Sequence, residues 1–503
     1  MEAHNIAVTK IAERVRHFYQ KRQPFRIYHG STLSTRHIVR QRDSVIDTSM
    51  LSSVLTVNKI SRTASVEPNV PMDQLLQATT AYGLLPPVVM EFPNITVGGG
   101  FAGSSGESSS FKYGMFDCTI NSIEIVLANG DIVTASASDP ETRDLFFGAA
   151  QTCGTLGVVT LLEVQLMESK PLVELTYLLS RSMPDALAKL KDAAVDSSVD
   201  YIDGIVYAPD SIVIMVGRLA SSQPSGTNLQ SFQGARDPWF YLHARDMLAE
   251  ATLRPTKSVS EYIPIADYLF RYDRGAFWGG AVAFEYFLAP FNRITRYLLD
   301  YFMRTRVMIH ALHRSGLARQ TIVQDLAVPY SSAEAFVDYL NQTLGIYPLW
   351  LCPVRDAAGA RNSPGVRTFA RGKDPHPDGM VLNVGVWGMG PSEVHSFIKL
   401  NREIEQKVRD LNGLKCLYAH AYYTESEFWE IYDEKSYTAL REKYHATSLP
   451  SIFDKVKVDL APPDPRDEMW FAWASRKFWD VWPLGGIYGV LSSLKGREFL
   501  LGK

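Results

Sequence analysis

The sequence is poor in cysteine and has no strong excess of charge of either sign. Its four cysteines, Cys118, Cys153, Cys352 and Cys416, stand far apart and form no C-x-x-C pair. This spacing fits neither a zinc site nor a disulfide framework, and it favours a reducing compartment. Lys and Arg number 51 against 54 Asp and Glu. Nucleic acid is therefore not an expected partner, because no global positive field exists to hold a phosphate backbone.

Long apolar runs are also missing. Residues 1–22 interrupt their apolar positions with charge, which predicts an amphipathic helix and not a signal peptide. No uncharged run approaches the roughly 18 residues that span a bilayer, so we expect a cytoplasmic protein without a transmembrane segment. The H-E-x-x-H, G-x-S-x-G and P-loop motifs are absent too, as are metal-spaced His clusters, so we expect no metal.

The chain has 503 residues, of which 46% are hydrophobic and 21% charged, and this composition is typical of a globular protein with two or three domains. Short strand-like runs with helices between them end near Lys170-Pro171, and longer aromatic-rich segments follow. We predict a first domain over 1–171, an α+β domain over 172–415, a helical return segment over 416–460 and an aromatic-rich tail over 461–503. The tail either packs on the body or touches a lipid surface, and packing is the favoured alternative.

Several local patterns predict individual elements. An Asn-Gly turn between two β-rich runs predicts a hairpin over residues 123–133. A Pro near the start and a Gly just past the end predict a helix over 71–83, and apolar spacing predicts another over 395–411. The capping box Thr424-x-x-Glu427 predicts a further helix.

The most informative segment lies between residues 96 and 108, where five glycines fall within thirteen positions. Gly98, Gly100 and Gly103 match G-x-G-x-x-G, which alone is a weak signal. A Rossmann fold also needs a helix opening at the glycines and an acid about twenty residues further on. The following residues show no helical period, and Glu124 falls inside the predicted hairpin. We therefore predict a loop whose backbone approaches a bulky anion, with a flexible surface loop as the alternative.

Five later segments accompany the glycine segment in a fixed order. They are residues 321–329, 346–353, 417–419, 427–430 and 437–443. Together with residues 107–114, the hairpin and the Cys-Gly-Thr-Leu-Gly run at 153–157, they resemble the delta(24)-sterol reductases (the Diminuto family), whose FAD-binding domain is of the vanillyl-alcohol-oxidase (PCMH) type. The resemblance covers roughly residues 20–460. It implies an α+β fold with a two-subdomain PCMH-type FAD-binding domain and a separate α+β substrate (cap) domain.

The same resemblance implies an activity. Hydride passes from NADPH onto FAD, and the C24–C25 side-chain double bond of a sterol or sterol-like substrate is reduced. The family's hydrophobic N-terminal anchor has no counterpart here, so we expect peripheral attachment to the endoplasmic reticulum membrane through the aromatic tail. Two alternatives stay open: an FAD-dependent oxidase or dehydrogenase of an alcohol or hydroxy acid on the same fold, and a non-catalytic sterol-binding protein.

Carried onto this sequence, the resemblance assigns the FAD diphosphate and ribityl region to one continuous segment. Its residues are Thr96, Val97, Gly98, Gly99, Gly100, Phe101, Ala102, Gly103, Ser104, Ser105, Gly106, Glu107 and Ser108. A second loop adds Gly154, Thr155 and Gly157, and the first pyrophosphate loop adds His29, Gly30 and Ser31. Noncovalent FAD is expected, because the His that carries a covalent flavin in the wider superfamily follows its glycines, whereas His29 precedes Gly30. The alternative for His29 is an ordinary exposed loop histidine.

Reduction of an isolated alkene needs a proton donor as well as hydride, because no carbonyl polarises the bond. The candidates are Lys112, Tyr113, Tyr422 and Glu427, and the first two are favoured because they lie beside the glycine segment. Each candidate also has a purely structural explanation. Glu427 completes its capping box, Lys112 pairs with a phosphate or carboxylate, and the tyrosines bury their rings.

Overall fold

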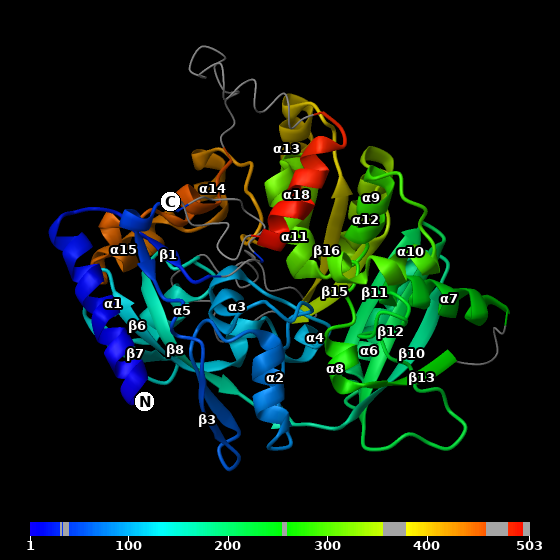
Figure 1. The fold of residues 1–503 in the computed structure, drawn as a ribbon, viewed down its shortest axis with the longest axis horizontal. Helices are drawn as coiled ribbons and strands as arrows, with labels where there is room; N and C mark the ends of the chain where they lie inside the picture. Colours follow the sequence, from blue (N-terminus) through cyan, green and yellow to red (C-terminus); the bar gives the residue numbers. More distant parts are fainter. Residues whose placement is uncertain (31–32, 34–39, 254–258, 356–378, 459–480, 496–503) are drawn as a thin grey trace.

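The computed structural model describes residues 1–30, 33, 40–253, 259–355, 379–458 and 481–495. Two antiparallel sheets organise the described part of the chain, one of five strands and one of eight (Figure 1). Helices stand beside both sheets, so the α+β class predicted from the sequence is confirmed. The chain passes from the smaller sheet to the larger one between Glu168 and Leu172. The division of the chain into four units stays a prediction.

The N-terminal half is built on the five-stranded sheet, whose strand order is β3-β4-β8-β6-β7. The strands are β3 (Val54–Asn58), β4 (Thr63–Val66), β6 (Ile120–Leu127), β7 (Ile132–Ser136) and β8 (Gly157–Gln165). β6 and β7 form the predicted hairpin, and Gly130 in its turn has a φ of +90°. Two short pairs join this half: β1 (Arg26–Tyr28) parallel to β2 (Val45–Asp47), and β5 (Leu84–Leu85) antiparallel to β9 (Met167–Glu168).

Helices of this half follow the apolar spacing of the sequence, with one exception. Helix α1 (Glu2–Gln20) buries Val8, Ile11, Val15 and Phe18 and confirms the amphipathic prediction. The other helices are α2 (Met72–Thr80), which confirms the helix predicted over 71–83, α4 (Ser110–Tyr113) and α5 (Arg143–Ala149).

The exception is the glycine segment, which was predicted as a loop but forms a short helix, α3 (Val97–Gly103). Each glycine costs a helix roughly 1 kcal/mol relative to alanine, so propensity alone does not explain α3. Close packing explains it: a Cβ at Gly98 would lie 2.6 Å from the Cβ of Pro68. Thr96 caps α3, because its Oγ1 accepts a hydrogen bond of 3.1 Å from the Gly99 N–H.

The eight-stranded sheet has the strand order β13-β10-β12-β11-β15-β16-β14-β17. Its strands are β10 (Leu172–Ser180), β11 (Tyr201–Ala208), β12 (Ser211–Ala220), β13 (Val259–Pro264), β14 (Thr321–Pro329), β15 (Leu349–Arg355), β16 (Met380–Met389) and β17 (Leu414–Lys415). One face packs on α6 (Met183–Val195), α12 (Tyr330–Thr343) and α13 (Val394–Asp410), and α13 confirms the helix predicted over 395–411. The period of two sends Leu349 and Leu351 to that face, and Trp350 and Cys352 to the face that meets the N-terminal half.

Further helices lie along the larger sheet and at the end of the chain. They are α7 (Phe240–Leu253), α8 (Ile265–Leu269), α9 (Gly279–Tyr286), α10 (Arg293–Leu298), α11 (Thr305–Ser315), α14 (Glu425–Ile431), α15 (Glu434–Lys443), α16 (Ile452–Val456) and α18 (Leu484–Lys495). The capping box predicted at Thr424 and Glu427 is present at α14. Trp470, Trp473, Phe478 and Trp479 of the tail lie outside the described residues. No described helix is both long and apolar enough to cross a bilayer.

The C-terminal helices return to the N-terminal half, where α15 lies beside α1 (Figure 1) and contacts α5. The Tyr437 hydroxyl of α15 donates to Thr155 Oγ1 over 2.8 Å. Lys443 Nζ forms an ion pair of 2.6 Å with Asp144. These contacts join residues that are about 300 positions apart in the sequence.

Candidate active site

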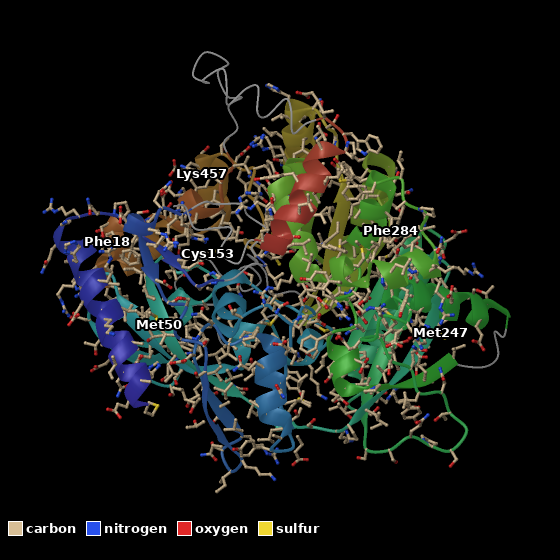
Figure 2. The ribbon with its side chains drawn as sticks, in the orientation of Figure 1. Phe18, Met50, Cys153, Met247, Phe284 and Lys457 are labelled. Atoms are coloured by element: carbon tan, nitrogen blue, oxygen red, sulfur yellow. The ribbon has the colours of Figure 1, made fainter. Side chains whose placement is uncertain are left out.

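A cavity of about 310 Å³ lies where the glycine segment meets the larger sheet. Its walls come mainly from the β1 end, α3 with the residues after it, the 153–157 loop, and the sheet face of β14, β15 and β16, with further residues from α11, the segment after β17 and α16. Figure 2 labels Cys153, one of the lining residues, near the middle of the molecule and below the C-terminal segment that carries Lys457. A single cavity thus reaches from the predicted cofactor segment to the second half.

Backbone hydrogen bonds fix the two loops beside the cavity to each other. The N–H groups of Gln151 and Cys153 donate to the carbonyls of Phe101 and Ala102, over 3.0 and 2.9 Å. Ser104, Gln151 and Cys153 all have positive φ values, of 66°, 60° and 53°. Non-glycine residues in this conformation are uncommon, and they cluster where the surrounding structure holds a functional backbone shape.

Positive charge gathers at the part of the cavity lined by β1 and the 153–157 loop. Arg26, Arg40 and Lys455 line it together with His29. Lys455 Nζ donates to the carbonyls of Cys153 and Gly154, over 2.7 and 3.2 Å. Burial and the nearby Arg40 lower the pKa of His29 to about 4, so this imidazole is neutral near pH 7. Cations beside a glycine-lined backbone suit a diphosphate, and the residues present therefore fit FAD.

The predicted cofactor residues divide into two groups. The group that lines the cavity is His29, Thr96, Gly98, Gly99, Ala102, Gly103, Ser104, Ser105, Gly106, Gly154 and Gly157. The second group lies outside the lining and consists of Gly30, Val97, Gly100, Phe101, Glu107, Ser108 and Thr155. In the second group, Val97 and Phe101 are core residues and Thr155 bonds to Tyr437. Ser31 lies outside the described residues.

Acidic and amide groups line the cavity from the larger sheet. Asp325 on β14 accepts a hydrogen bond of 2.9 Å from Asn383 Nδ2 and a second one from the Tyr418 hydroxyl. Asp325 pairs in register with Gly385, and an added Cβ there would lie 3.0 Å from Asp325 Oδ1. Burial raises the pKa of Asp325 despite these two donors. The cavity therefore contains a carboxyl group whose affinity for a proton is increased by burial.

Two further carboxyl groups, those of Glu91 and Glu107, lie at the junction of the two halves. Burial and the adjacent Glu107 hold the pKa of Glu91 well above its usual range. Burial also raises the pKa of Glu107 to about 7, although Arg271 opposes this shift. Glu107 Oε2 accepts from the Ser108 N–H over 2.7 Å, and its buried Oε1 has no hydrogen-bond partner among the described residues.

A buried ion pair supports this junction from the larger sheet. Arg271 Nη2 donates to Asp203 over 2.8 Å, and neither side chain is exposed to solvent. The same Asp203 oxygen accepts from the Tyr272 hydroxyl over 2.7 Å and from the Trp350 indole N–H over 3.2 Å. Because Trp350 lines the cavity, this network fixes part of its wall.

None of the four predicted proton donors lines the cavity. Lys112 forms an ion pair of 3.1 Å with Asp200, and the Tyr113 ring lies beside it. Tyr422 packs edge-on against Phe397, and Glu427 completes its capping box and pairs with Arg402 over 3.0 Å. These contacts match the structural explanations given for each residue, and a catalytic role for any of them stays a prediction that its position does not favour.

Sequence reasoning missed Asp325, Asn383 and Tyr418 as site residues. Asp325 and Asn383 carried a usable signal, since each is a polar residue inside a largely apolar and buried strand. Asp325 and Tyr418 also lie in the segments 321–329 and 417–419 that resemble the family, but that resemblance assigned no role to either side chain. Among the described residues, no group of three His, Cys, Asp or Glu side chains is placed to hold a metal ion.

Comparison with known proteins bears on both halves of the chain. The family model of an FAD binding domain matches residues 7–136. The Delta(24)-sterol reductase of Arabidopsis thaliana is 30% identical over 446 residues, covering 83% of this chain and 77% of that protein. The human Delta(24)-sterol reductase is 29% identical over 418 residues, covering 81% and 76%. Cytokinin dehydrogenase 9 of Oryza sativa is 30% identical over 135 residues, which are 26% of this chain.

The FAD-binding domain and the cavity that joins it to a second sheet define a flavin-dependent oxidoreductase. The similarity to the sterol reductases extends over four fifths of the chain and includes the second half. The chain belongs to the Delta(24)-sterol reductase family.

We expect Lys455→Met to weaken FAD binding by about tenfold or more, because hydrogen bonds to charged groups contribute about 1.5–3 kcal/mol each. The substitution removes one cation and both hydrogen bonds to the 153–154 carbonyls. Lys457→Met is the matched control, since Lys457 contacts Asp454 and the Phe453 ring and does not line the cavity. Calorimetric titration of the apoprotein with FAD measures both. Equal affinities for the two variants would contradict this role of Lys455.

We expect Glu107→Gln to stabilise the protein at pH values above about 7 and to have little effect near pH 4.5. Folding raises the pKa of Glu107 from 4.5 to about 7, so the folded state binds more protons than the unfolded state between these values. Stability therefore falls as pH rises through this window, by roughly 3 kcal/mol at most. Thermal midpoints at both ends of the window measure the effect. Glu168→Gln, which removes the exposed partner of Arg62, should give no such stabilisation above pH 7, and a pH-independent effect of Glu107→Gln would contradict the prediction.

Proposed function

We propose that this protein uses NADPH and FAD to reduce the C24–C25 side-chain double bond of a sterol or sterol-like substrate. The observation that carries the proposal is the single cavity that brings a glycine-lined cofactor segment to a buried carboxyl group on the other half. Relatives named Delta(24)-sterol reductase support the substrate class. Because such a substrate is water-insoluble, we also propose peripheral contact with the endoplasmic reticulum membrane.

One side of the cavity would bind the cofactor, and the opposite side would orient the substrate. The backbone of residues 98–106 and the cations Arg26, Arg40 and Lys455 would hold the diphosphate of FAD. FAD, when bound, carries hydride equivalents from the nicotinamide to the substrate carbon. Trp350 and Trp387, which line the sheet side, would exclude water and orient an apolar side chain.

Asp325 is the proton donor that this arrangement favours. A proton delivered to C24 leaves positive character on the more substituted C25, to which hydride is then transferred. Burial favours the protonated form of Asp325, and its carboxyl group lines the cavity. After proton transfer, hydrogen bonds from Tyr418 and Asn383 would stabilise the carboxylate.

The first experiment is an anaerobic absorbance titration of the purified protein with NADPH and then with desmosterol in detergent. We expect flavin bands that bleach with NADPH and return with the sterol. Bands that return only with air, together with oxygen consumption on an alcohol or hydroxy acid, would replace the proposal with the oxidase alternative. A protein that binds desmosterol but shows no flavin bands would replace it with the sterol-binding alternative.

We expect Asp325→Asn to slow flavin reoxidation by the sterol by about 10²–10⁴-fold, the usual contribution of general acid catalysis. Bleaching by NADPH should keep its rate, because that step needs no proton from Asp325. Tyr422→Phe is the matched control, since Tyr422 lies outside the cavity lining. Stopped-flow measurement of the two half-reactions separates the effects. Slow reoxidation in Tyr422→Phe and normal reoxidation in Asp325→Asn would assign the proton to Tyr422.

A further inference from the structure

Helix α18 packs on the molecule through its glycines and not through its large apolar residues. Gly485, Gly486 and Gly489 are its buried positions. A Cβ at Gly486 would collide with the rings of Tyr286 and Phe287, and one at Gly489 would collide with the backbone of α11. Small residues at a helix contact, with larger apolar residues on the outside, are the arrangement of helices that face lipid.

The outer surface of α18 is accordingly apolar. Ile487, Leu491 and Leu494 follow helical spacing and are 44%, 54% and 51% exposed. At the start of the helix, Trp482 is 51% exposed, and its indole N–H donates to the Tyr286 carbonyl over 2.6 Å. A helix of a water-facing surface has the opposite distribution, with polar residues outside.

A second group of exposed apolar residues lies in the segment between α9 and α11, which meets α18 through Tyr286 and Phe287. Tyr286 and Phe287, which contact Gly486, lead into Leu288, which is 75% exposed. Three further large residues of the segment are exposed by 71%, 70% and 60%: Ile294, Leu298 and Tyr301. We call Leu288, which follows the residues that contact α18, together with Trp482, Ile487, Leu491 and Leu494, the apolar face. Figure 1 shows α18 alongside α11, to which this segment leads.

The charges around the apolar face are mostly positive, although the whole protein has a net charge of −3. Residues 285–319 contain six arginines and two acidic residues, the exposed Glu285 and Asp300, which is buried against Arg274 over 2.7 Å. The one charged residue of α18 is Lys495. Burial lowers the pKa of His310 to about 4. Arg306, His313 and Arg314 lower it further, and their contribution reflects the positive field along α11.

We infer that the apolar face is a docking surface for a bilayer that contains anionic lipid. Exposed Leu, Ile and Trp side chains would enter the acyl boundary, while the arginines would face the headgroups. The opposite side of α11 lines the cavity through Thr305 and Ile309, so one helix separates the docked surface from the reaction site. This inference deepens the membrane contact proposed above by assigning it to one surface, and it rests on the proposed reaction only for the substrate that the bilayer would supply.

The test is co-sedimentation of the full chain with vesicles of phosphatidylcholine, alone or mixed with phosphatidylserine, without NADPH or sterol. We expect stronger binding to the mixed vesicles and loss of the difference at high salt. The double variant Leu491→Glu/Leu494→Glu should bind at least about tenfold more weakly to both, because it places charges in the acyl boundary. Arg293→Glu/Arg306→Glu should lose only the preference for phosphatidylserine, since it replaces two cations that attract an anionic surface.

The matched control is Ile60→Glu/Val195→Glu, which changes two apolar residues that are 97% and 83% exposed but lie outside the apolar face. This control should bind vesicles like the wild type. Wild-type protein that does not sediment, or apolar-face variants that sediment as well as it does, would overturn the inference. A dimer that Leu491→Glu/Leu494→Glu dissociates, in a protein that binds no vesicles, would replace the bilayer with a second copy of the chain.

Failure of this inference is distinguishable from failure of the proposed function. Reduction of detergent-dispersed desmosterol needs no bilayer, so Leu491→Glu/Leu494→Glu should keep that activity while losing vesicle binding. If the protein binds vesicles but does not reduce the sterol, the result would support the docking surface and contradict the proposed substrate.

Discussion

The site depends on how closely the backbone of residues 97–106 approaches its neighbours. A side chain at Gly98 would collide with Pro68, and one at Gly106 would lie 2.9 Å from the sulfur of Met115. The carbonyls of Phe101 and Ala102 are thereby within reach of the 151–153 loop, which they fix by hydrogen bonds. Once the two loops are joined, the cavity has a wall of backbone on one side. Side-chain chemistry is then supplied by the opposite wall.

That opposite wall follows from the period of two in the larger sheet. Alternate residues of β14, β15 and β16 pack on helices, so Asp325, Trp350, Cys352 and Asn383 share the other face. Register then places Asn383 opposite Cys352 and Gly385 opposite Asp325. Beside this face a hydrogen bond joins the two halves of the molecule, because the Cys352 thiol donates to the Glu107 backbone carbonyl over 3.3 Å. Burial at this contact shifts the pKa values of the carboxyl groups on both sides.

Much of the fold was predictable because its signals are local. The Asn-Gly turn of the β6–β7 hairpin, the capping box at Thr424 and the apolar spacing of α1, α2 and α13 each act within a few residues. Helix α3 was not predictable from propensity, since long-range packing against Pro68 decides its conformation. The same limit applies to the site. Cavity-lining glycines follow from a local motif, whereas Tyr418 and Asp325 meet across 93 positions of sequence.

The position of the C-terminal helices also bears on how the protein is made. Lys455 and Tyr437 hold the 153–157 loop, yet both are synthesised some 300 residues after it. When only the N-terminal half has emerged from the ribosome, the contacts that Lys455 and Tyr437 make with the 153–157 loop cannot yet form. Flavin capture with full affinity is therefore a late event in biosynthesis, which follows release of nearly the whole chain from the ribosome.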